Sequence, residues 1–322
     1  MKAIRVHKPG GREALVYEDV PNLKAGPGQV LMRVEAAGVN FIDVYYRTGV
    51  YQTALPVTVG QEGAGTVIEA GEGVTDVKAG DRIAFYGGFG AYAEQAVVPA
   101  DKVVPVPDGV SAKQAAAVLL QGMTAEYLTS STYPLGPKDT CLIHAAAGGV
   151  GLLFCQVAKA TGARVIGTTS TEEKARLARE AGADEVILYT QTDFEAEVKR
   201  LTGGRGVDVV YDSVGKTTFE KGLNCLRPRG YMVLFGQSSG VVDPVAPGTL
   251  QAKGSLFLTR PTLVHHTLTR EELLGRAGRV FGWVARGALK VHIHAEYALR
   301  DAAQAHAALE GRGTVGKLIL VP

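Results

Sequence analysis

The sequence predicts an α/β protein in which a doubly wound parallel domain is inserted into a β-rich domain. Three observations favour this fold class. Short strand-like segments separated by Gly and Pro fill residues 1 to about 110, and apolar strands alternate with helical stretches from about residue 140. A last part of mixed strand and helical character follows Pro261. The 322 residues suffice for two domains, at roughly 100–200 residues each.

The first part of the chain has the pattern of a β domain. Residues 30–36 and 65–70 have the apolar character of strands, and turn signals stand at Pro27-Gly28 and Gly80-Asp81. Many short strands with regular turns are typical of sandwiches and barrels. The pattern changes at residues 111–120, which are Ala-rich and helical in character.

The middle part alternates strands and helices. Its candidate strands are residues 141–145, 164–167, 185–188, 207–211 and 231–235, with a further candidate at 255–259. Helical stretches such as 171–181 and 194–201 lie between them. Because parallel strands need crossover connections, this alternation predicts a parallel, doubly wound sheet.

The last part fits the β-rich domain better than the doubly wound one. It contains a helix over about residues 270–286, a helix near 301–309 and a final strand at 317–320. We therefore expect the β-rich domain in residues 1–120 and 263–322, with the doubly wound domain in residues 121–262.

Composition and charge exclude several classes of protein. The 34 basic and 32 acidic residues give a net charge of +2, which offers no electrostatic reason to expect nucleic-acid binding. The chain has no uninterrupted apolar span of about 18 residues, so no membrane segment is expected. Cys141, Cys155 and Cys225 are odd in number and widely spaced, so they form no disulfide framework. A cytoplasmic location fits best.

A glycine-rich turn carries the main functional signal. An apolar strand runs into Ala145-Ala146-Ala147-Gly148-Gly149-Val150-Gly151, and a helix rich in Leu, Phe and Val follows through Lys159. Small residues let backbone amides approach a pyrophosphate, and the helix N-terminus adds N–H donors and a favourable dipole. Ala145 stands where the usual fingerprint has its first Gly, so the strand–turn–helix context carries the prediction of a dinucleotide site.

The end of the second strand indicates which dinucleotide binds. The segment Thr168-Thr169-Ser170-Thr171 carries no acid, although NAD sites usually place Asp or Glu there. Hydroxyls, a helix N-terminus and Lys174 would suit a 2′-phosphate, so we expect NADPH. Ser170 and Glu173 also have the spacing of a capping box, which needs no ligand. Glu172 and Glu173 would repel a phosphate if they pointed at it.

Several landmarks resemble the medium-chain dehydrogenases/reductases. In the first part these are Asn40-Phe41-Ile42-Asp43, Leu55-Pro56, Gly60-Gln61-Glu62-Gly63-Ala64-Gly65 and Gly80-Asp81-Arg82. Residues 144–151, 210–215 and 254–256 are similar to the zinc-independent NADPH:quinone oxidoreductase branch, which includes ζ-crystallin. The resemblance covers essentially the whole chain. It implies a GroES-like β domain, a Rossmann domain with a cleft between them, and quinone reduction with NADPH, commonly in a homodimer.

Departures from the zinc alcohol dehydrogenases predict a site without metal. Those enzymes have a Cys near the position of Asn40 and a His before the Glu of the Gly-x-Glu motif, where this chain has Gln61. Neither Asn nor Gln is a usual zinc ligand, and a lobe of four close cysteines is absent. His292 and His294 share one face of an expected strand, but two histidines make a poor metal site. Without a metal a quinone is an easier substrate than an alcohol, because it is already a good electron acceptor.

The resemblance also implies site residues. Asn40 and Tyr51, with Tyr46 as a further candidate, would lie near the nicotinamide and could hydrogen-bond a developing oxyanion. The residues implied for cofactor binding are Asn40, Asp43, Thr124, Gly148, Gly149, Val150, Ser170, Lys174, Tyr189, Ser213, Val214, Phe235, Gly236 and Lys317. Structural roles stay open for the tyrosines, for Thr124 and for Lys317, and Asp43 equally fits a stabiliser of its turn.

Other functions fit the same residues. A zinc-free enoyl or alkenal reductase would use the same hydride with a different pocket and a proton donor. A structural or RNA-binding protein that keeps NADPH without catalysis is a rival of another class, although the near-neutral charge argues against nucleic acid. We expect a small-molecule quinone substrate, no membrane partner, and a homodimer in which residues 255–258 pair as an edge strand.

Overall fold

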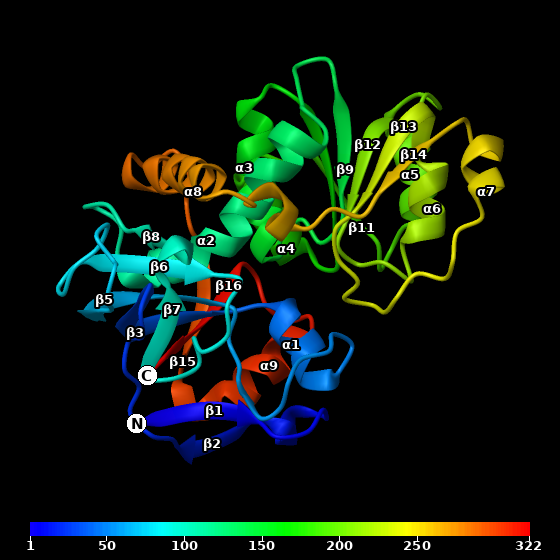
Figure 1. Cartoon of the computed structure of the whole chain (residues 1–322). Coiled ribbons are helices and arrows are strands. Elements are labelled where there is room, and N and C mark those ends of the chain that lie inside the picture. Colours follow the sequence, from blue (N-terminus) through cyan, green and yellow to red (C-terminus); the bar gives the residue numbers. More distant parts are fainter. The chain divides into compact units, whose positions relative to one another are not determined.

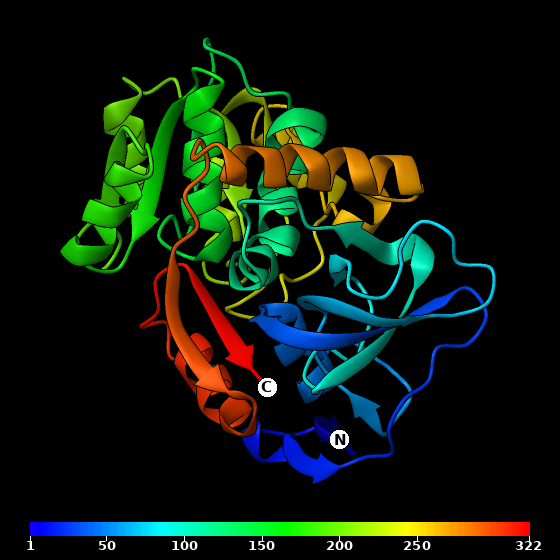
Figure 2. The ribbon, with the colours of Figure 1, turned by 90° about the vertical axis from the view of Figure 1, so that its left-hand side faces the viewer.

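The computed structural model describes residues 1–322, which fold as two compact units. Unit 1 comprises residues 1–123 and 267–322, and unit 2 comprises residues 124–266. The chain leaves unit 1 within helix α2 (Ala112–Tyr127) and returns just before helix α8 (Arg270–Ala285), so one unit is inserted into the other. Both chain termini belong to unit 1 (Figures 1 and 2). The units divide after residues 123 and 266, where the sequence places boundaries after 120 and 262.

The larger sheet of unit 1 has the strand order β15-β16-β3-β5-β6-β8, and β7 pairs with β3 beside this path. Neighbouring strands are antiparallel except β15 and β16, which are parallel. Apolar side chains such as Met32, Ile83 and Leu318 form one buried core. The strands are β3 (Gln29–Val39), β5 (Glu62–Ala70), β6 (Arg82–Tyr86), β7 (Gln95–Pro99), β8 (Val103–Pro105), β15 (Ile293–Ala298) and β16 (Lys317–Val321).

A smaller sheet and several helices complete unit 1. Strand β1 (Lys2–Val6) lies between β2 (Val16–Asp19) and β4 (Val57–Thr58). Helix α9 (Ala302–Glu310) packs against β15 and β16, beside which it lies in Figure 2. Helix α8 packs against β8. Short helical turns occur at η1 (Arg12–Ala14), η2 (Ala100–Lys102) and η5 (Leu299–Asp301).

Helix α1 (Phe41–Thr48) is absent from the sequence prediction, which has only strands in this part of the chain. The helix begins after Asn40, whose backbone N–H donates to the Asp43 carboxylate three residues later at 2.9 Å. It ends at Gly49, whose φ of 81° is left-handed and suits glycine. An Asn before the helix, an acid at its third position and a Gly after it are the signals that could have found α1.

Unit 2 contains a six-stranded parallel sheet with the order β11-β10-β9-β12-β13-β14. Its first strand in the chain, β9, lies in the middle, so the sheet grows in opposite directions from β9 and β12. Ligands of doubly wound sheets bind at the carboxyl ends of the strands near such a reversal. The strands are β9 (Thr140–Ile143), β10 (Arg164–Thr169), β11 (Glu185–Leu188), β12 (Val207–Asp212), β13 (Leu226–Leu234) and β14 (Phe257–Thr259).

Helices cover both faces of this sheet, which confirms the predicted doubly wound domain. Figure 1 shows α3 (Gly149–Ala160) and α4 (Glu172–Glu180) on one side, with α5 (Phe194–Leu201) and α6 (Phe219–Asn224) on the other. Central strand residues are therefore fully buried, as the continuous apolar runs require. The rest of unit 2 includes η3 (Leu128–Thr132), α7 (Pro247–Ala252) and η4 (Leu263–His266).

Some predicted element bounds need correction. The strand expected at 65–70 begins at Glu62, because the small residues after it also pair with neighbouring strands. The strand expected at 231–235 begins earlier, at Leu226, and ends at Leu234. His292 lies one residue before β15, which begins at Ile293, and both His292 and His294 are exposed.

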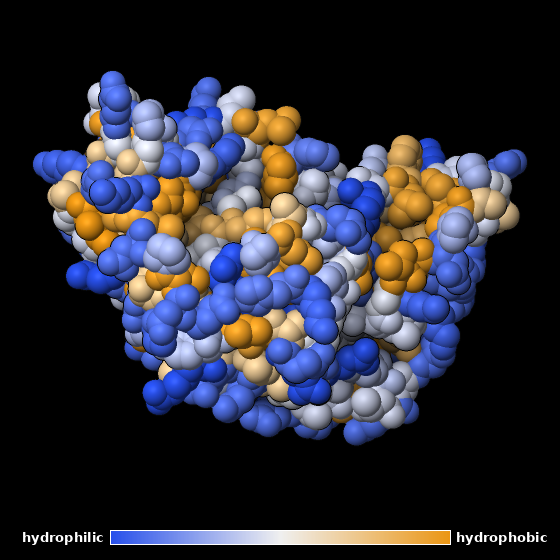
Figure 3. All heavy atoms as spheres, turned by 60° about the horizontal axis from the view of Figure 1, so that its bottom comes forward, coloured by the Kyte–Doolittle hydropathy of each residue, from blue (hydrophilic) through white to orange (hydrophobic).

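Hydrophilic residues cover most of the molecular face in Figure 3, and hydrophobic residues on it form separate patches. Exposed large apolar residues include Val16 and Tyr17 on β2 and Phe257 and Leu258 on β14. Both strands are edges of their sheets. None of the helices combines the length and the apolar character that crossing a membrane requires.

Substitution of Gly60 should destabilise unit 1. A Cβ at Gly60 would lie 2.4 Å from a ring carbon of Tyr92 and 2.6 Å from its backbone nitrogen, and φ is +97°. Gly73 has a similar φ of +80° but open space around it, so Gly73→Ala controls for backbone strain alone. We expect Gly60→Ala to lower the free energy of unfolding by about 3 kcal/mol and Gly73→Ala by about 1 kcal/mol, measured by urea denaturation. Equal losses would contradict the steric account.

Candidate functional site

The side chain of Asn40 is the centre of a buried polar cluster in unit 1. Its Oδ1 accepts hydrogen bonds from Lys317 Nζ at 2.6 Å and from Gln121 Nε2 at 3.2 Å. Its Nδ2 donates to Glu62 Oε2 at 2.9 Å and to the Gly38 carbonyl at 3.2 Å. Both N–H groups and both lone pairs of the amide are thus occupied. Asn40 is also only 4% exposed, so its amide has no N–H left for a ligand as it stands.

A buried ion pair fixes this cluster. Lys317 Nζ lies 2.7 Å from Glu62 Oε2, and both side chains are almost fully buried. The other carboxylate oxygen of Glu62 accepts from the Leu120 backbone N–H at 2.6 Å. Gly38 leaves room for the pair, because a Cβ there would lie 2.4 Å from Glu62 Oε2. Lys317, expected at the cofactor, therefore contacts Asn40 and Glu62 in this structure.

Asp43 is a buried carboxylate that holds backbone in place. Its Oδ2 accepts from the Asn40 N–H at 2.9 Å and from the Tyr92 hydroxyl at 3.1 Å, and its Oδ1 accepts from the Gln61 N–H at 3.0 Å. Burial raises the pKa of Asp43 to about 7, against the opposing effect of these hydrogen bonds and of Lys317. These contacts are those of a turn stabiliser, the structural alternative to cofactor binding.

Aromatic rings gather on α1 and the loops beside it. The rings of Tyr46 and Tyr51 meet edge to face with centroids 5.6 Å apart, and Phe89 meets Tyr46 in the same way at 4.8 Å. Burial raises the pKa of Tyr46, with smaller contributions from Tyr51 and Asp43. The Tyr46 and Tyr51 hydroxyls have no hydrogen-bond partner within the chain. Phe89 is absent from the sequence prediction, and its place between Gly88 and Gly90 is the only signal for it.

The glycine-rich turn of unit 2 has the geometry of a phosphate cradle. Ala145 has a φ of 54°, the left-handed conformation that usually selects Gly at this point of the fingerprint. Gly148 caps α3, and Gly149 and Val150 open the helix with N–H groups that have no partner inside it. A Cβ at Gly151 would lie 2.3 Å from the Ala145 carbonyl oxygen, so only Gly allows this approach of helix to turn.

The ends of β10 and β11 bring together three residues predicted for the 2′-phosphate: Ser170, Lys174 and Tyr189. The Tyr189 N–H donates to the Thr169 carbonyl at 3.1 Å, which places Tyr189 beside the end of β10. Lys174 lies in the first turn of α4, and burial lowers its pKa. The capping box expected from Ser170 is wrong, because Thr171 caps α4 and accepts from the Lys174 N–H at 3.3 Å. Both residues carry a hydroxyl, and the helix begins one residue later than the pattern suggests.

The loops after β12 and β13 form one layer at the same edge of the sheet. Asp212 is fully buried and accepts from the N–H groups of Val214 and Gly215 at 2.7 and 3.0 Å. The Ser213 carbonyl accepts from the Ser238 N–H at 3.1 Å. A Cβ at Gly236 would lie 2.6 Å from the Ser213 carbonyl oxygen, so Gly236 is required by this contact. Phe235, with its N–H bonded to the Asp212 carbonyl at 2.8 Å, lies in the same layer.

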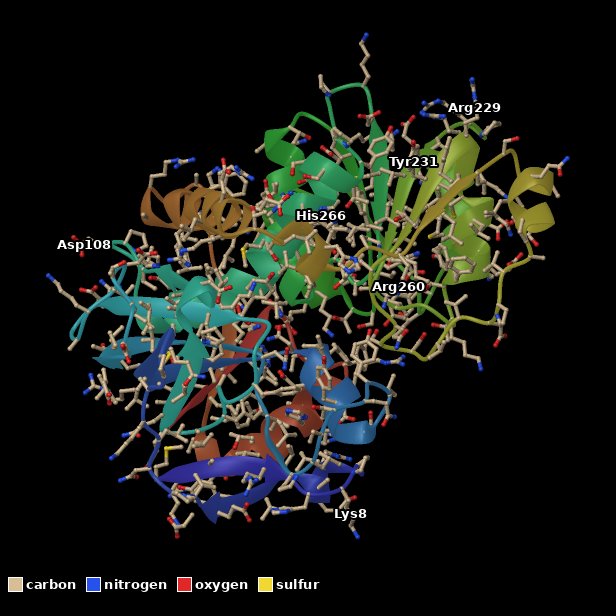
Figure 4. All side chains as sticks on the ribbon, in the orientation of Figure 1. Lys8, Asp108, Arg229, Tyr231, Arg260 and His266 are labelled. Atoms are coloured by element: carbon tan, nitrogen blue, oxygen red, sulfur yellow. The ribbon has the colours of Figure 1, made fainter.

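One cation at this edge is absent from the sequence prediction. Arg260 directly follows β14 at its carboxyl end and is exposed (Figure 4). Its guanidinium makes one weak contact, of 3.5 Å, to the neighbouring Pro261 carbonyl. An Arg after the last strand of a parallel sheet is a signal that could have been used, since ligands meet that edge. Thr124, by contrast, lies in α2 and is buried.

The predicted residues thus fall into two groups. Asn40, Asp43 and Lys317 share one cluster in unit 1, and the remaining cofactor-binding candidates except Thr124 line the carboxyl edge of the sheet in unit 2. No group of three or more His, Cys, Asp or Glu side chains is arranged to hold a metal ion. Cys141, Cys155 and Cys225 are free and buried in unit 2, where burial raises the pKa of each thiol.

Two families match parts of the chain. The alcohol dehydrogenase GroES-like domain matches residues 26–108, and the zinc-binding dehydrogenase family matches residues 149–272. A quinone oxidoreductase of Pseudomonas aeruginosa is 48% identical to the chain and aligns with 100% of it and 99% of its own length. A 2-haloacrylate reductase of Burkholderia is 43% identical over 98% of each chain. The solved structure of Escherichia coli quinone oxidoreductase complexed with NADPH has a TM-score of 0.98, 44% identity and full coverage of both chains.

The turn geometry predicts that Gly151→Ala weakens dinucleotide binding. The added Cβ must push the start of α3 away from the Ala145 carbonyl, which moves the helix N–H groups that would meet the pyrophosphate. We expect the dissociation constant for NADPH, measured by fluorescence titration, to rise at least tenfold, or about 1.4 kcal/mol. Gly136→Ala is the control, because its Cβ would meet only Asp139 Oδ2 at an ordinary 3.7 Å. Unchanged NADPH affinity in Gly151→Ala would contradict the assignment of this turn as the phosphate-binding site.

Proposed function

The chain belongs to the quinone oxidoreductase family of the medium-chain dehydrogenases/reductases, and we propose that it is an NADPH-dependent quinone reductase that works without a metal ion. One observation carries this function: the chain aligns from end to end with a quinone oxidoreductase whose structure contains NADPH. The chain's own residues fit that cofactor. Gly151 lets the N-terminus of α3 approach the turn at Ala145, and hydroxyls with a cation, rather than an acid, follow β10.

The residues of unit 2 would bind and orient the cofactor. The N–H groups of Gly149 and Val150 would meet the pyrophosphate at the N-terminus of α3. Ser170, Lys174 and Tyr189 would meet the 2′-phosphate, and the layer formed by Ser213, Val214, Phe235 and Gly236 would support the nicotinamide end. Arg260 is a further candidate for a phosphate contact. When bound, reduced nicotinamide supplies the hydride that a quinone accepts.

The residues of unit 1 would act on the acceptor. Tyr46 and Tyr51 have hydroxyls without partners in the chain, so either can donate to an oxygen that gains negative charge. The rings of Tyr46, Tyr51 and Phe89 form an aromatic surface suited to a planar quinone. Asn40 would contribute by holding its turn, because its amide is already fully bonded to Lys317, Glu62, Gln121 and Gly38.

A zinc ion does not fit these residues. Asn40 and Gln61 occupy the positions compared with zinc ligands, and both are buried with amide rather than thiolate or imidazole groups. The cation in this cluster is the ammonium of Lys317, paired with Glu62. The proposed reaction therefore rests on orientation and hydrogen bonding, which suffice for an acceptor as reactive as a quinone.

We also propose a cytoplasmic homodimer. Three free, buried cysteines fit a reducing compartment. Strand β14 pairs only with β13 and exposes Phe257 and Leu258, so a second copy is the simplest cover for this apolar edge.

Turnover with defined acceptors tests the function. Oxidation of NADPH and of NADH would be followed by nicotinamide absorbance with 1,4-benzoquinone, 9,10-phenanthrenequinone or crotonyl-CoA, before and after exhaustive chelation. We expect chelator-resistant oxidation of NADPH by the quinones. Turnover of crotonyl-CoA alone would assign the chain to the alkene reductases, and loss of activity after chelation would contradict the metal-free reaction.

Lys174→Ala should change cofactor preference. Removing a cation that meets the 2′-phosphate should raise the dissociation constant for NADPH about tenfold or more, while that for NADH changes by less than about twofold. Arg176→Ala removes a cation from the same helix that is paired with Glu180, so it is the matched control. Calorimetric titration of both dinucleotides measures the effect, and equal weakening of NADPH and NADH by Lys174→Ala would refute the assignment.

A further inference from the structure

Four buried side chains form a hydrogen-bonded chain that ends at Asp43. Arg47 Nη1 lies 3.1 Å from His306 Nδ1, and His306 Nε2 lies 3.2 Å from the Tyr92 hydroxyl. The Tyr92 hydroxyl lies 3.1 Å from Asp43 Oδ2. Arg47, Tyr92 and His306 are buried. We call these four residues the Asp43 chain.

The direction of every bond in the Asp43 chain follows from its first member. An arginine can only donate, so His306 Nδ1 must accept, and the proton of the neutral imidazole must sit on Nε2. His306 then donates to the Tyr92 oxygen, and Tyr92 donates to the carboxylate of Asp43. Burial and the charge of Arg47 lower the pKa of His306 to about 3, which agrees with a neutral ring.

The Asp43 chain is not a route for protons. Arg47 does not release a proton in proteins, and its other bonds go to the Glu310 carboxylate at 2.7 and 3.1 Å. The Asp43 chain instead links separate parts of unit 1. Arg47 and Asp43 belong to α1, Tyr92 lies between β6 and β7, and His306 lies in α9.

Asp43, the last member of the Asp43 chain, contacts residues that the proposed reaction uses. Asp43 receives the N–H groups of Asn40 and Gln61, and α1 continues from Asp43 to Tyr46. A change in the charge or position of Asp43 must therefore move the turn at Asn40 and the tyrosines of α1. The residues proposed for the reaction are thus held by side chains buried in the core of unit 1.

We propose that Tyr92 and His306 are positioning residues for quinone reduction, which hold Asp43 and through it the Asn40 turn and Tyr46. This inference rests on the proposed function. Tyr92 is the link that can be removed most cleanly, because phenylalanine keeps its ring and deletes only the shared hydroxyl.

The pKa of Asp43 gives the Asp43 chain a measurable signature. The titratable or charged groups around Asp43 are Lys317 from β16, Tyr92 with His306 behind it, Tyr46 and Arg47 on α1, and Glu62 on β5. With a pKa of about 7 in Asp43, activity should fall as pH drops through about 7, because protonation removes the charge that strengthens its three hydrogen bonds. The hydrogen bond from Tyr92 lowers this pKa, so its removal should raise it.

Tyr92→Phe tests the proposal. We expect kcat with NADPH and 9,10-phenanthrenequinone to fall about tenfold with little change in KM, and the acid limb of the pH profile to move up by about one unit. Tyr86→Phe is the matched control, because it deletes a buried tyrosine hydroxyl of unit 1 that bonds to Thr267 and not to Asp43. His306→Gln can still accept from Arg47 and donate to Tyr92, so it should keep the acid limb near the wild-type position. His306→Leu can do neither and should move the limb as Tyr92→Phe does.

A second readout does not depend on turnover. A raised pKa in the folded state means that the stability due to protonated Asp43 is present at low pH and lost as pH rises to about 7. The pKa of His306 is lowered in the folded state, so below pH 6.5 its titration destabilises the fold and opposes the contribution of Asp43. The informative pH window therefore lies above pH 7. There Tyr92→Phe should lose more unfolding free energy than wild type over about one pH unit. The buried thiols, whose pKa values are also raised, are common to both proteins, so their contribution cancels in this comparison.

The possible outcomes distinguish failure of the proposed function from failure of the positioning role of Tyr92 and His306. If wild type fails to oxidise NADPH with quinones, the proposed function fails, while the unfolding measurement still reports on Asp43. If wild type is active but Tyr92→Phe and Tyr86→Phe lose equal activity with the acid limb unmoved, the positioning role is overturned. An unmoved limb in His306→Leu overturns it as well, even if Tyr92→Phe does not fold.

Discussion

The ion pair between Lys317 and Glu62 is the constraint on which unit 1 depends. It joins the last strand, β16, to β5 in the interior, where an unpaired charge would cost several kcal/mol, so neither residue can be present without the other. The pair also orients Asn40, which has no freedom to rotate once Oδ1 accepts from Lys317 and Nδ2 donates to Glu62. Because β16 follows unit 2 in the sequence, the cluster combines Asn40 and Glu62, which precede unit 2, with Lys317, which follows it.

Unit 2 obeys a different constraint, which is steric rather than electrostatic. Its ligand edge is built where backbones approach too closely for any side chain, at Gly151 against Ala145 and at Gly236 against Ser213. These contacts leave N–H groups facing outward at a helix N-terminus, which suits a pyrophosphate. Buried Asp212 holds the loop after β12 through hydrogen bonds from Val214, Gly215 and Thr218. In the proposed function, unit 2 would bind the cofactor and unit 1 would arrange groups for its acceptor.

Patterns along the chain predict unit 2 well, because strands covered on both faces are continuous apolar runs and small residues mark the cofactor turn. Unit 1 is harder. Helix α1 is short and rich in aromatic and β-branched residues, so its propensity is weak and its caps are the main local signal. The Asp43 chain is invisible in the sequence, since Arg47 and His306 are 259 residues apart and each reads as an ordinary surface residue. The four hydrogen-bond partners of Asn40 are likewise absent from the sequence prediction, because they are known only from the fold.

In the proposed reaction, Asn40 is held by its hydrogen bonds and tyrosine hydroxyls meet the acceptor. A crystal structure with NADPH and a non-reducible quinone analogue is the most direct test. We expect Asn40 to keep its hydrogen bonds to Lys317 and Glu62, and a hydroxyl of Tyr46 or Tyr51 to donate to a quinone oxygen. An Asn40 amide turned away from Lys317 to bond the quinone, with both tyrosine hydroxyls distant from it, would refute the proposed arrangement.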